Sequence, residues 1–128
     1  MIRISAVSYL NTFPFVYGLK KSGMLDDLRL ELDVPSVCAR KLQNGEVDIA
    51  LVPVGALTDM PDYQIVSPYC IGAQEKVRTV LLLSQMPLPE IRTIHLDYDS
   101  RTSVRLVKIL ASQFWKIHPE WKNLQADL

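Results

Sequence analysis

The sequence predicts an α/β fold built on parallel strands. Short, mostly apolar strand patterns alternate with patterns of helical spacing along the first half of the chain. Residues 47–52 (VDIALV) form the kind of short, mostly apolar strand that a parallel sheet buries on both faces. Residues 102–115 then give the best amphipathic helix of the sequence. Strands that alternate with helices in this way are typical of βαβ units.

The first half contains three predicted strands separated by helices. Proline and glycine mark their limits: Pro14 suits the first turn of a helix, and Gly23 and Gly45 can end helices. In the second strand, alternation predicts that Leu28, Leu30, Leu32 and Val34 point the same way. In chain order the sequence predicts a strand at 2–7, a helix at 12–22, a strand at 28–34, a helix at 35–44, a strand at 47–52 and one helical turn at 54–57.

The second half is less regular. Residues 77–84 are a strand candidate through a run of four apolar residues, and the prolines that follow indicate a linker at about 84–92. A strand is expected at 93–97, and residues 117–121 read as a loop or helix start. The helix at 102–115 is expected to place on one face Val104, Val107, Leu110, Ala111 and Phe114.

Composition and charge narrow the class of partner. The 14 basic and 14 acidic residues cancel, and no block of like charge occurs, which argues against nucleic acid or an anionic membrane as a partner. Cys38, Cys70, His95 and His118 fit no metal spacing or disulfide framework, so no metal site is expected. No apolar run approaches the ~20 residues of a membrane span. The start of the chain reads as a strand rather than a signal peptide, and a cytoplasmic setting is expected.

Two polar segments each follow a predicted strand and each open a predicted helix. They are residues 8–12 (SYLNT) and residues 100–103 (SRTS). The first turn of a helix has unpaired backbone N–H groups and a partial positive charge, so it can hold a carboxylate or phosphate. Serine, threonine and asparagine are also the ordinary N-cap residues, and capping alone explains such clusters. The sequence leaves both interpretations open.

Three segments resemble the chorismate dehydratase family of the futalosine route to menaquinone, called MqnA. Residues 7–12 (VSYLNT) resemble its opening signature, residues 45–54 (GEVDIALVPV) its second, and residues 96–97 with 100–104 (LD, SRTSV) its third. The resemblance covers nearly the whole chain. The second segment also occurs across periplasmic-binding-protein-like folds and indicates fold more than activity.

The resemblance implies a type II periplasmic-binding-protein-like fold with a ligand between two α/β lobes. Residues 1–85 would form the first lobe and 92–128 the start of a second, incomplete one. An incomplete lobe would leave strand edges and apolar surface unpaired, so a homo-oligomer is expected. The implied activity removes the C3 proton and C4 hydroxyl of chorismate to give 3-[(1-carboxyvinyl)oxy]benzoate. Aromatisation drives this reaction without a cofactor.

The resemblance also suggests roles for individual residues. Asn11 is the expected catalytic residue, because its amide can polarise the C4 hydroxyl or fix the enolpyruvyl arm. Arg101 suits a charge-assisted bond to a carboxylate. The remaining substrate-binding candidates are Ser8, Tyr9, Thr12, Thr79, Ser100, Thr102 and Ser103.

Other residues and other functions remain open. Asp97 and Asp99 are expected to cap or face solvent, and the substrate's own enolpyruvyl carboxylate is the hypothesised proton acceptor. Two alternatives to the dehydratase share the implied fold. One is a non-catalytic module that binds small anions, and the other is the sister 1,4-dihydroxy-6-naphthoate synthase type of enzyme. The SYLN segment favours the dehydratase.

Overall fold

The chain forms two compact units in a computed structural model, residues 1–72 and 73–128. The structure describes residues 1–97 and 100–124. Each unit carries a small parallel sheet with helices, so the predicted α/β class is confirmed. The division lies earlier in the chain than the predicted lobe boundary at 85–92, and the two lobes stay a prediction.

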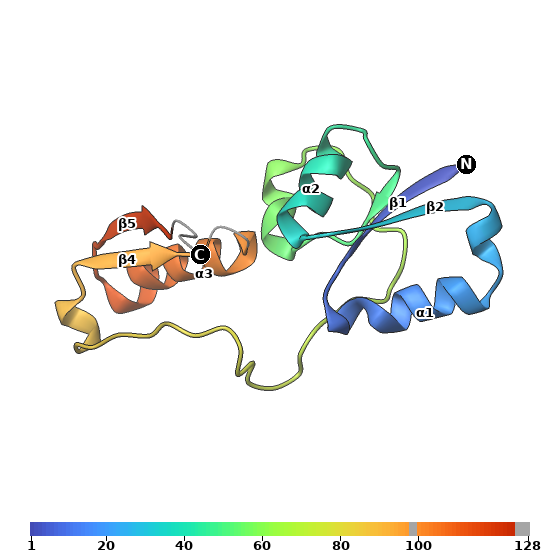
Figure 1. Ribbon diagram of the computed structural model, residues 1–128. Helices are drawn as coiled ribbons and strands as arrows, with labels where there is room; N and C mark the ends of the chain where they lie inside the picture. The colour runs from blue at the N-terminus through green and yellow to red at the C-terminus, as the bar shows by residue number, and fades with distance from the viewer. Residues whose placement is uncertain (98–99, 125–128) are drawn as a thin grey trace. The chain divides into compact units, whose positions relative to one another are not determined.

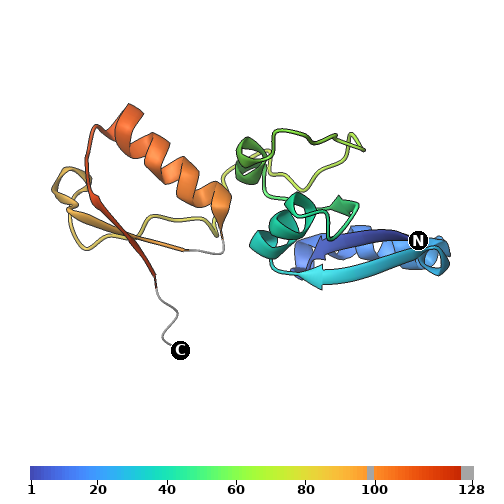
Figure 2. The ribbon, with the colours of Figure 1, turned by 90° about the horizontal axis from the view of Figure 1, so that it is seen from above.

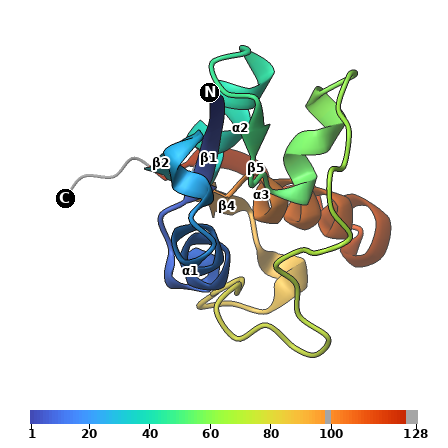
Figure 3. The same ribbon diagram turned by 90° about the vertical axis from the view of Figure 1, so that its right-hand side faces the viewer.

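The first unit has a three-stranded parallel sheet in the order β2-β1-β3, with β1 in the centre (Figure 1). The connection through α1 leads from β1 to β2, on one side of β1. The connection through α2 leads from β2 past β1 to β3, on the other side of β1. Right-handed crossovers in opposite directions place the two helices on opposite faces of the sheet, as Figures 1 and 3 show. The elements are β1 (Ile2–Val7), η1 (Leu10–Thr12), α1 (Phe13–Lys21), η2 (Met24–Asp26), β2 (Leu28–Asp33), α2 (Pro35–Gln43), β3 (Ile49–Ala50) and η3 (Val54–Asp59).

The boundaries of these elements follow the local signals in the sequence. Pro14 and Pro35 lie in the first turns of α1 and α2, where a missing N–H costs little. Gly23 and Gly45 follow the two helices at φ values of 73° and 69°, a left-handed conformation that glycine adopts without strain. The predicted strand at 28–34 and helix at 35–44 are thereby confirmed to within a residue or two.

The two faces of the β1–β2 pair differ in chemistry. Ile4 lies beside Leu30 and Ala6 beside Leu32, while Ser5 lies beside Glu31 and Val7 beside Asp33. Since side chains alternate along a strand, one face is aliphatic and the α2 face is mostly polar. Leu30 and Leu32 share the aliphatic face, as the alternation predicted, and Leu32 on the edge strand β2 is 55% exposed there.

The second unit is a βαβ arrangement. The parallel strands β4 and β5 are joined by α3, which lies along one face of the pair (Figure 2). Ile91, Ile94 and Leu96 form its buried centre, and Val104 and Val107 of α3 pack on them. The elements are η4 (Leu88–Glu90), β4 (Thr93–Leu96), α3 (Arg101–Ile109), η5 (Leu110–Trp115) and β5 (Glu120–Asn123).

Three predictions about the second unit need correction. Residues 77–84 are not a strand, since no neighbouring strand pairs with them, and their apolar run is exposed. Residues 120–123 are a strand rather than the start of a helix, because Trp121 pairs with Ile94 of β4. Phe114 leaves the apolar face of the helix and is 73% exposed, because the last turns widen to the π form in η5.

One further correction concerns the predicted strand at 47–52. Its paired part is only Ile49–Ala50, although Asp48 and Leu51 extend the contact through backbone bonds to Arg3 and Ser5 of β1. Asp48 also accepts hydrogen bonds from Arg3, with its Oδ1 lying 2.8 Å from Nη2. This ion pair and the backbone bonds hold β3 against the central strand.

Candidate functional site

The segment Ser8–Thr12 begins where the central strand β1 ends. Ser8 N–H donates to the carbonyl oxygen of Asp33 at 2.8 Å, which continues the β1–β2 ladder by one bond. The chain then turns directly into helix, and Thr12 N–H donates to the carbonyl oxygen of Tyr9 at 3.0 Å. The turn therefore lies at the carboxyl edge of a parallel sheet, where α/β folds commonly bind ligands.

This helix start has no side-chain cap. Neither Tyr9, which precedes η1, nor Thr12, which precedes α1, makes a side-chain bond to a first-turn N–H group. The first N–H groups of a helix have no acceptor within the helix. Because neither N-cap side chain accepts from them, the first N–H groups of η1 can bind an anion.

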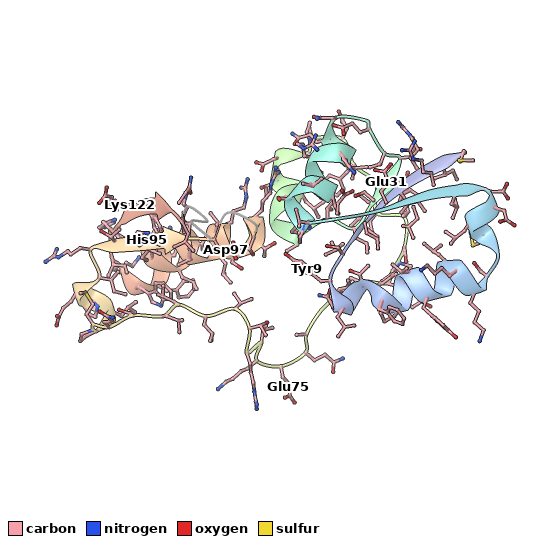
Figure 4. The ribbon with its side chains drawn as sticks, viewed as in Figure 1. Tyr9, Glu31, Glu75, His95, Asp97 and Lys122 are labelled. Carbon is pink, nitrogen blue, oxygen red and sulfur yellow. The ribbon has the colours of Figure 1, made fainter. Side chains whose placement is uncertain are left out.

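The side chains of the turn divide into exposed and buried ones. Ser8 and Asn11 are exposed, and Tyr9 is 49% exposed. Thr12 is only 1% exposed, and its buried Oγ1 has no hydrogen-bond partner among the residues described. Buried polar groups are normally paired, so this hydroxyl retains an unused capacity to donate and accept a bond within the turn. Figure 4 labels Tyr9 in the first unit.

The segment Ser100–Ser103 in the second unit behaves differently. Ser100 Oγ accepts a hydrogen bond from Ser103 N–H at 3.3 Å and donates to Ser103 Oγ at 2.7 Å. Ser100 is thus the N-cap of α3, and the capping interpretation is confirmed for this segment. The cap uses one first-turn N–H group, so this helix start offers fewer free donors than the turn in the first unit.

The remaining predicted site residues are placed as follows. Arg101 and Thr102 are half-buried in the first turn of α3. Thr79 is exposed in the irregular stretch, and Asp97 follows β4, where Figure 4 labels it. Asp99, which was expected to cap or face solvent, lies outside the described residues. Within 1–97 and 100–124, no three His, Cys, Asp or Glu side chains gather in a way that could hold a metal ion.

The structure reveals a polar network that the sequence-based analysis missed. Asp33 Oδ2 accepts hydrogen bonds from Ser5 Oγ at 2.8 Å and from Lys41 Nζ at 2.6 Å. Lys41 Nζ also donates to Glu31 Oε2 at 2.7 Å, on the α2 face of the sheet. The signal was present as polar residues at alternate positions of two strands, Ser5 in one and Glu31 and Asp33 in the other.

Among the described residues, no helix is long and apolar enough to cross a membrane. The family model described as menaquinone biosynthesis matches residues 2–128, which is almost the full length. This match, together with the three signature segments, leads to one conclusion: the chain belongs to the menaquinone biosynthesis family.

Proposed function

We propose that this chain is a chorismate dehydratase, or part of one, that forms 3-[(1-carboxyvinyl)oxy]benzoate within menaquinone biosynthesis. The observation that carries the proposal is the uncapped Ser8–Thr12 turn at the carboxyl edge of the sheet. A family chain with such a turn is suited to bind a small dianion. We further propose the type II periplasmic-binding-protein-like fold and a cytoplasmic setting, which the sequence resemblance implies.

The proposed chemistry is a loss of water. The C3–H bond of chorismate breaks and its electron pair forms the new C3–C4 double bond, while the C4–O bond breaks. The C3 proton passes to the substrate's enolpyruvyl carboxylate and then to the departing hydroxide, so that water leaves and the ring becomes aromatic. The protein then has to orient the substrate and stabilise the charge that develops on the leaving oxygen.

Individual residues have distinct roles in this proposal. The first-turn N–H groups of the Ser8–Thr12 turn and the Thr12 hydroxyl hold one carboxylate. The exposed Asn11 amide donates a hydrogen bond to the C4 hydroxyl as it leaves. In the second unit, the proposed substrate-binding residues are Thr79, Ser100, Arg101, Thr102 and Ser103.

The test is incubation with chorismate, with the product identified by NMR. We expect the enolpyruvyl benzoate from the parent chain, and we expect Asn11→Ala to lower turnover far more than substrate binding. Asn44→Ala is the matched control, because Asn44 is an exposed asparagine at the end of α2, outside the turn. Equal losses of turnover and binding in Asn11→Ala would contradict the catalytic role of Asn11.

The same experiment separates the alternative functions. A binding module would bind chorismate or another small dianion without forming product. The sister type of enzyme would leave chorismate unchanged and act on a cyclic futalosine-derived substrate. Either result, obtained also with a chain that extends beyond residue 128, would overturn the dehydratase proposal.

A further inference from the structure

Asp33 connects the polar network on the α2 face to the Ser8–Thr12 turn. Its backbone carbonyl oxygen accepts the Ser8 N–H at 2.8 Å, which fixes the first residue of the turn. Its side chain is the centre of the network, with Ser5 Oγ and Lys41 Nζ both bound to Oδ2. One residue therefore anchors the turn through its backbone and is itself anchored through its carboxylate.

The network is well shielded for a set of charged groups. The side chains of Lys41 and Asp33 are 16% and 17% exposed, and Ser5 is fully buried. By contrast, Arg40 of the same helix pairs with Glu46, which follows the helix, and these two side chains are 49% and 43% exposed. Shielded ion pairs are screened less by solvent and salt. Removing one partner of such a pair therefore disturbs the remaining charge more than it would at the surface.

The charges in the network are set by several neighbours. Burial raises the pKa of the Asp33 carboxyl, but hydrogen bonds from Lys41 and Ser5 and the charges of Lys41 and Arg40 outweigh it and lower that pKa. The hydrogen bond from Lys41 also lowers the pKa of Glu31. The Cys38 thiol, whose pKa is raised mainly by burial, lies 3.9 Å from the Asp33 carbonyl oxygen and stays neutral.

At neutral pH, Asp33 is therefore an ionised carboxylate one hydrogen bond away from a turn suited to bind an anion. An unbalanced negative charge on Asp33, whose side chain is 17% exposed, would repel an anionic ligand at the turn, because a shielded charge is screened less by solvent. Lys41 contacts both carboxylates of the network and supplies the nearest positive charge.

We infer that Lys41 is a positioning residue for the anion-binding turn: it holds Asp33, which holds Ser8, and it cancels the Asp33 charge that would oppose the ligand. Insofar as the ligand is chorismate, the inference rests on the proposed function. The part that concerns the turn itself does not depend on the identity of the ligand.

The first experiment uses chorismate and three variants. We expect Lys41→Met to raise the KM for chorismate about tenfold, with a smaller change in kcat, and Lys41→Arg to stay close to the parent. The double variant Lys41→Met/Asp33→Asn also removes the Asp33 charge that Lys41 no longer balances, and it is expected to recover most of the affinity. Lys20→Gln is the matched control, because it removes an exposed lysine at the end of α1, outside the network. A double variant as impaired as Lys41→Met would overturn the role of charge.

The second experiment uses the parent chain alone and does not require enzymatic activity. The Ser8 amide resonance of the parent chain, followed by NMR from pH 7 downward, should shift as the Asp33 carboxyl takes up its proton. A Ser8 amide that does not respond while the Asp33 side chain titrates would overturn the positioning role. The titration tests the connection between Asp33 and Ser8 without any ligand. A failure of that connection is therefore distinguishable from a failure of the proposed function.

Discussion

At the scale of single residues, the turn after β1 combines exposed polar groups with one buried hydroxyl. Ser8 and Asn11 face outward, whereas Thr12 Oγ1 is enclosed and unpartnered among the described residues. An unpaired buried hydroxyl lowers the stability of the fold, and proteins tend to retain such groups at functional sites. The residue is therefore informative about both stability and binding.

Replacing Thr12 by valine should separate these two properties. Because an unpaired buried hydroxyl costs about 1–3 kcal/mol, we expect Thr12→Val to raise the free energy of unfolding by about 1 kcal/mol. Chorismate binding should weaken, because the variant lacks the hydroxyl. Urea denaturation and a binding titration measure the two effects. Ser5→Ala is the control. The buried Ser5 hydroxyl has a partner, so removing it should lower the free energy of unfolding. A similar decrease in Thr12→Val would contradict the prediction.

Asp48 should make stability depend on pH in the acid range. Hydrogen bonds from the Arg3 side chain and backbone lower the pKa of the Asp48 carboxyl from 3.8 to about 2. Between these values the unfolded chain binds the proton more readily, so the contribution of Asp48 is present above pH 3.8 and is lost as the pH falls toward 2. The difference in urea midpoint between the parent and Asp48→Asn should thus be constant from pH 7 to 5 and shrink below pH 4. A difference that grows on acidification would contradict this sign.

At the scale of elements, the two helix starts differ in their side-chain capping. The run that begins with η1 leaves its first N–H groups without a side-chain cap, whereas α3 is capped by Ser100. The same residue types precede both helices, so composition alone suggested equivalent sites. The difference in hydrogen bonding indicates that the first helix start is the stronger anion-binding candidate.

Two variants of Ser100 should distinguish capping from ligand binding. Ser100→Ala removes the acceptor for Ser103 N–H and should cost about 1 kcal/mol of stability. Ser100→Asp keeps a good N-cap and should retain that stability, but its negative charge should raise the KM for chorismate if the substrate is bound beside it. Thermal denaturation and steady-state kinetics report the two quantities. An Ala variant as stable as the parent would show that the cap contributes nothing.

At the scale of the whole molecule, the chain carries a run of exposed apolar residues outside its two sheets. Val80, Leu81, Leu82 and Leu83 are 53%, 67%, 39% and 83% exposed. Contiguous exposed apolar surface is characteristic of association sites. The sequence pattern of this run favours a strand, which needs a partner for its backbone groups.

We therefore expect concentration-dependent self-association through this run, as the sequence-based prediction of a homo-oligomer requires. Sedimentation velocity over a range of concentrations measures it. The double variant Leu81→Lys/Leu83→Lys should shift the chain toward the monomer, whereas Met24→Lys, at a comparably exposed residue near α1, should not. A monomer at all concentrations would contradict the expectation.

The sequence by itself determined the order and type of most elements, because their signals are local. Prolines set the first turns of α1 and α2, glycines with positive φ end them, and alternation defines β2. The three signature segments also determined the family, since they are read without any knowledge of contacts.

Tertiary structure decided what depends on partners from distant parts of the chain. Residues 120–123 became a strand because β4 pairs with them, whereas residues 77–84 lack such a neighbour. The Asp33–Lys41 contact joins a strand to a helix, and the exposure of Asn11 and burial of Thr12 depend on how the turn packs. Pairing, burial and charge balance arise only when separate segments meet, and no pattern within one segment contains them.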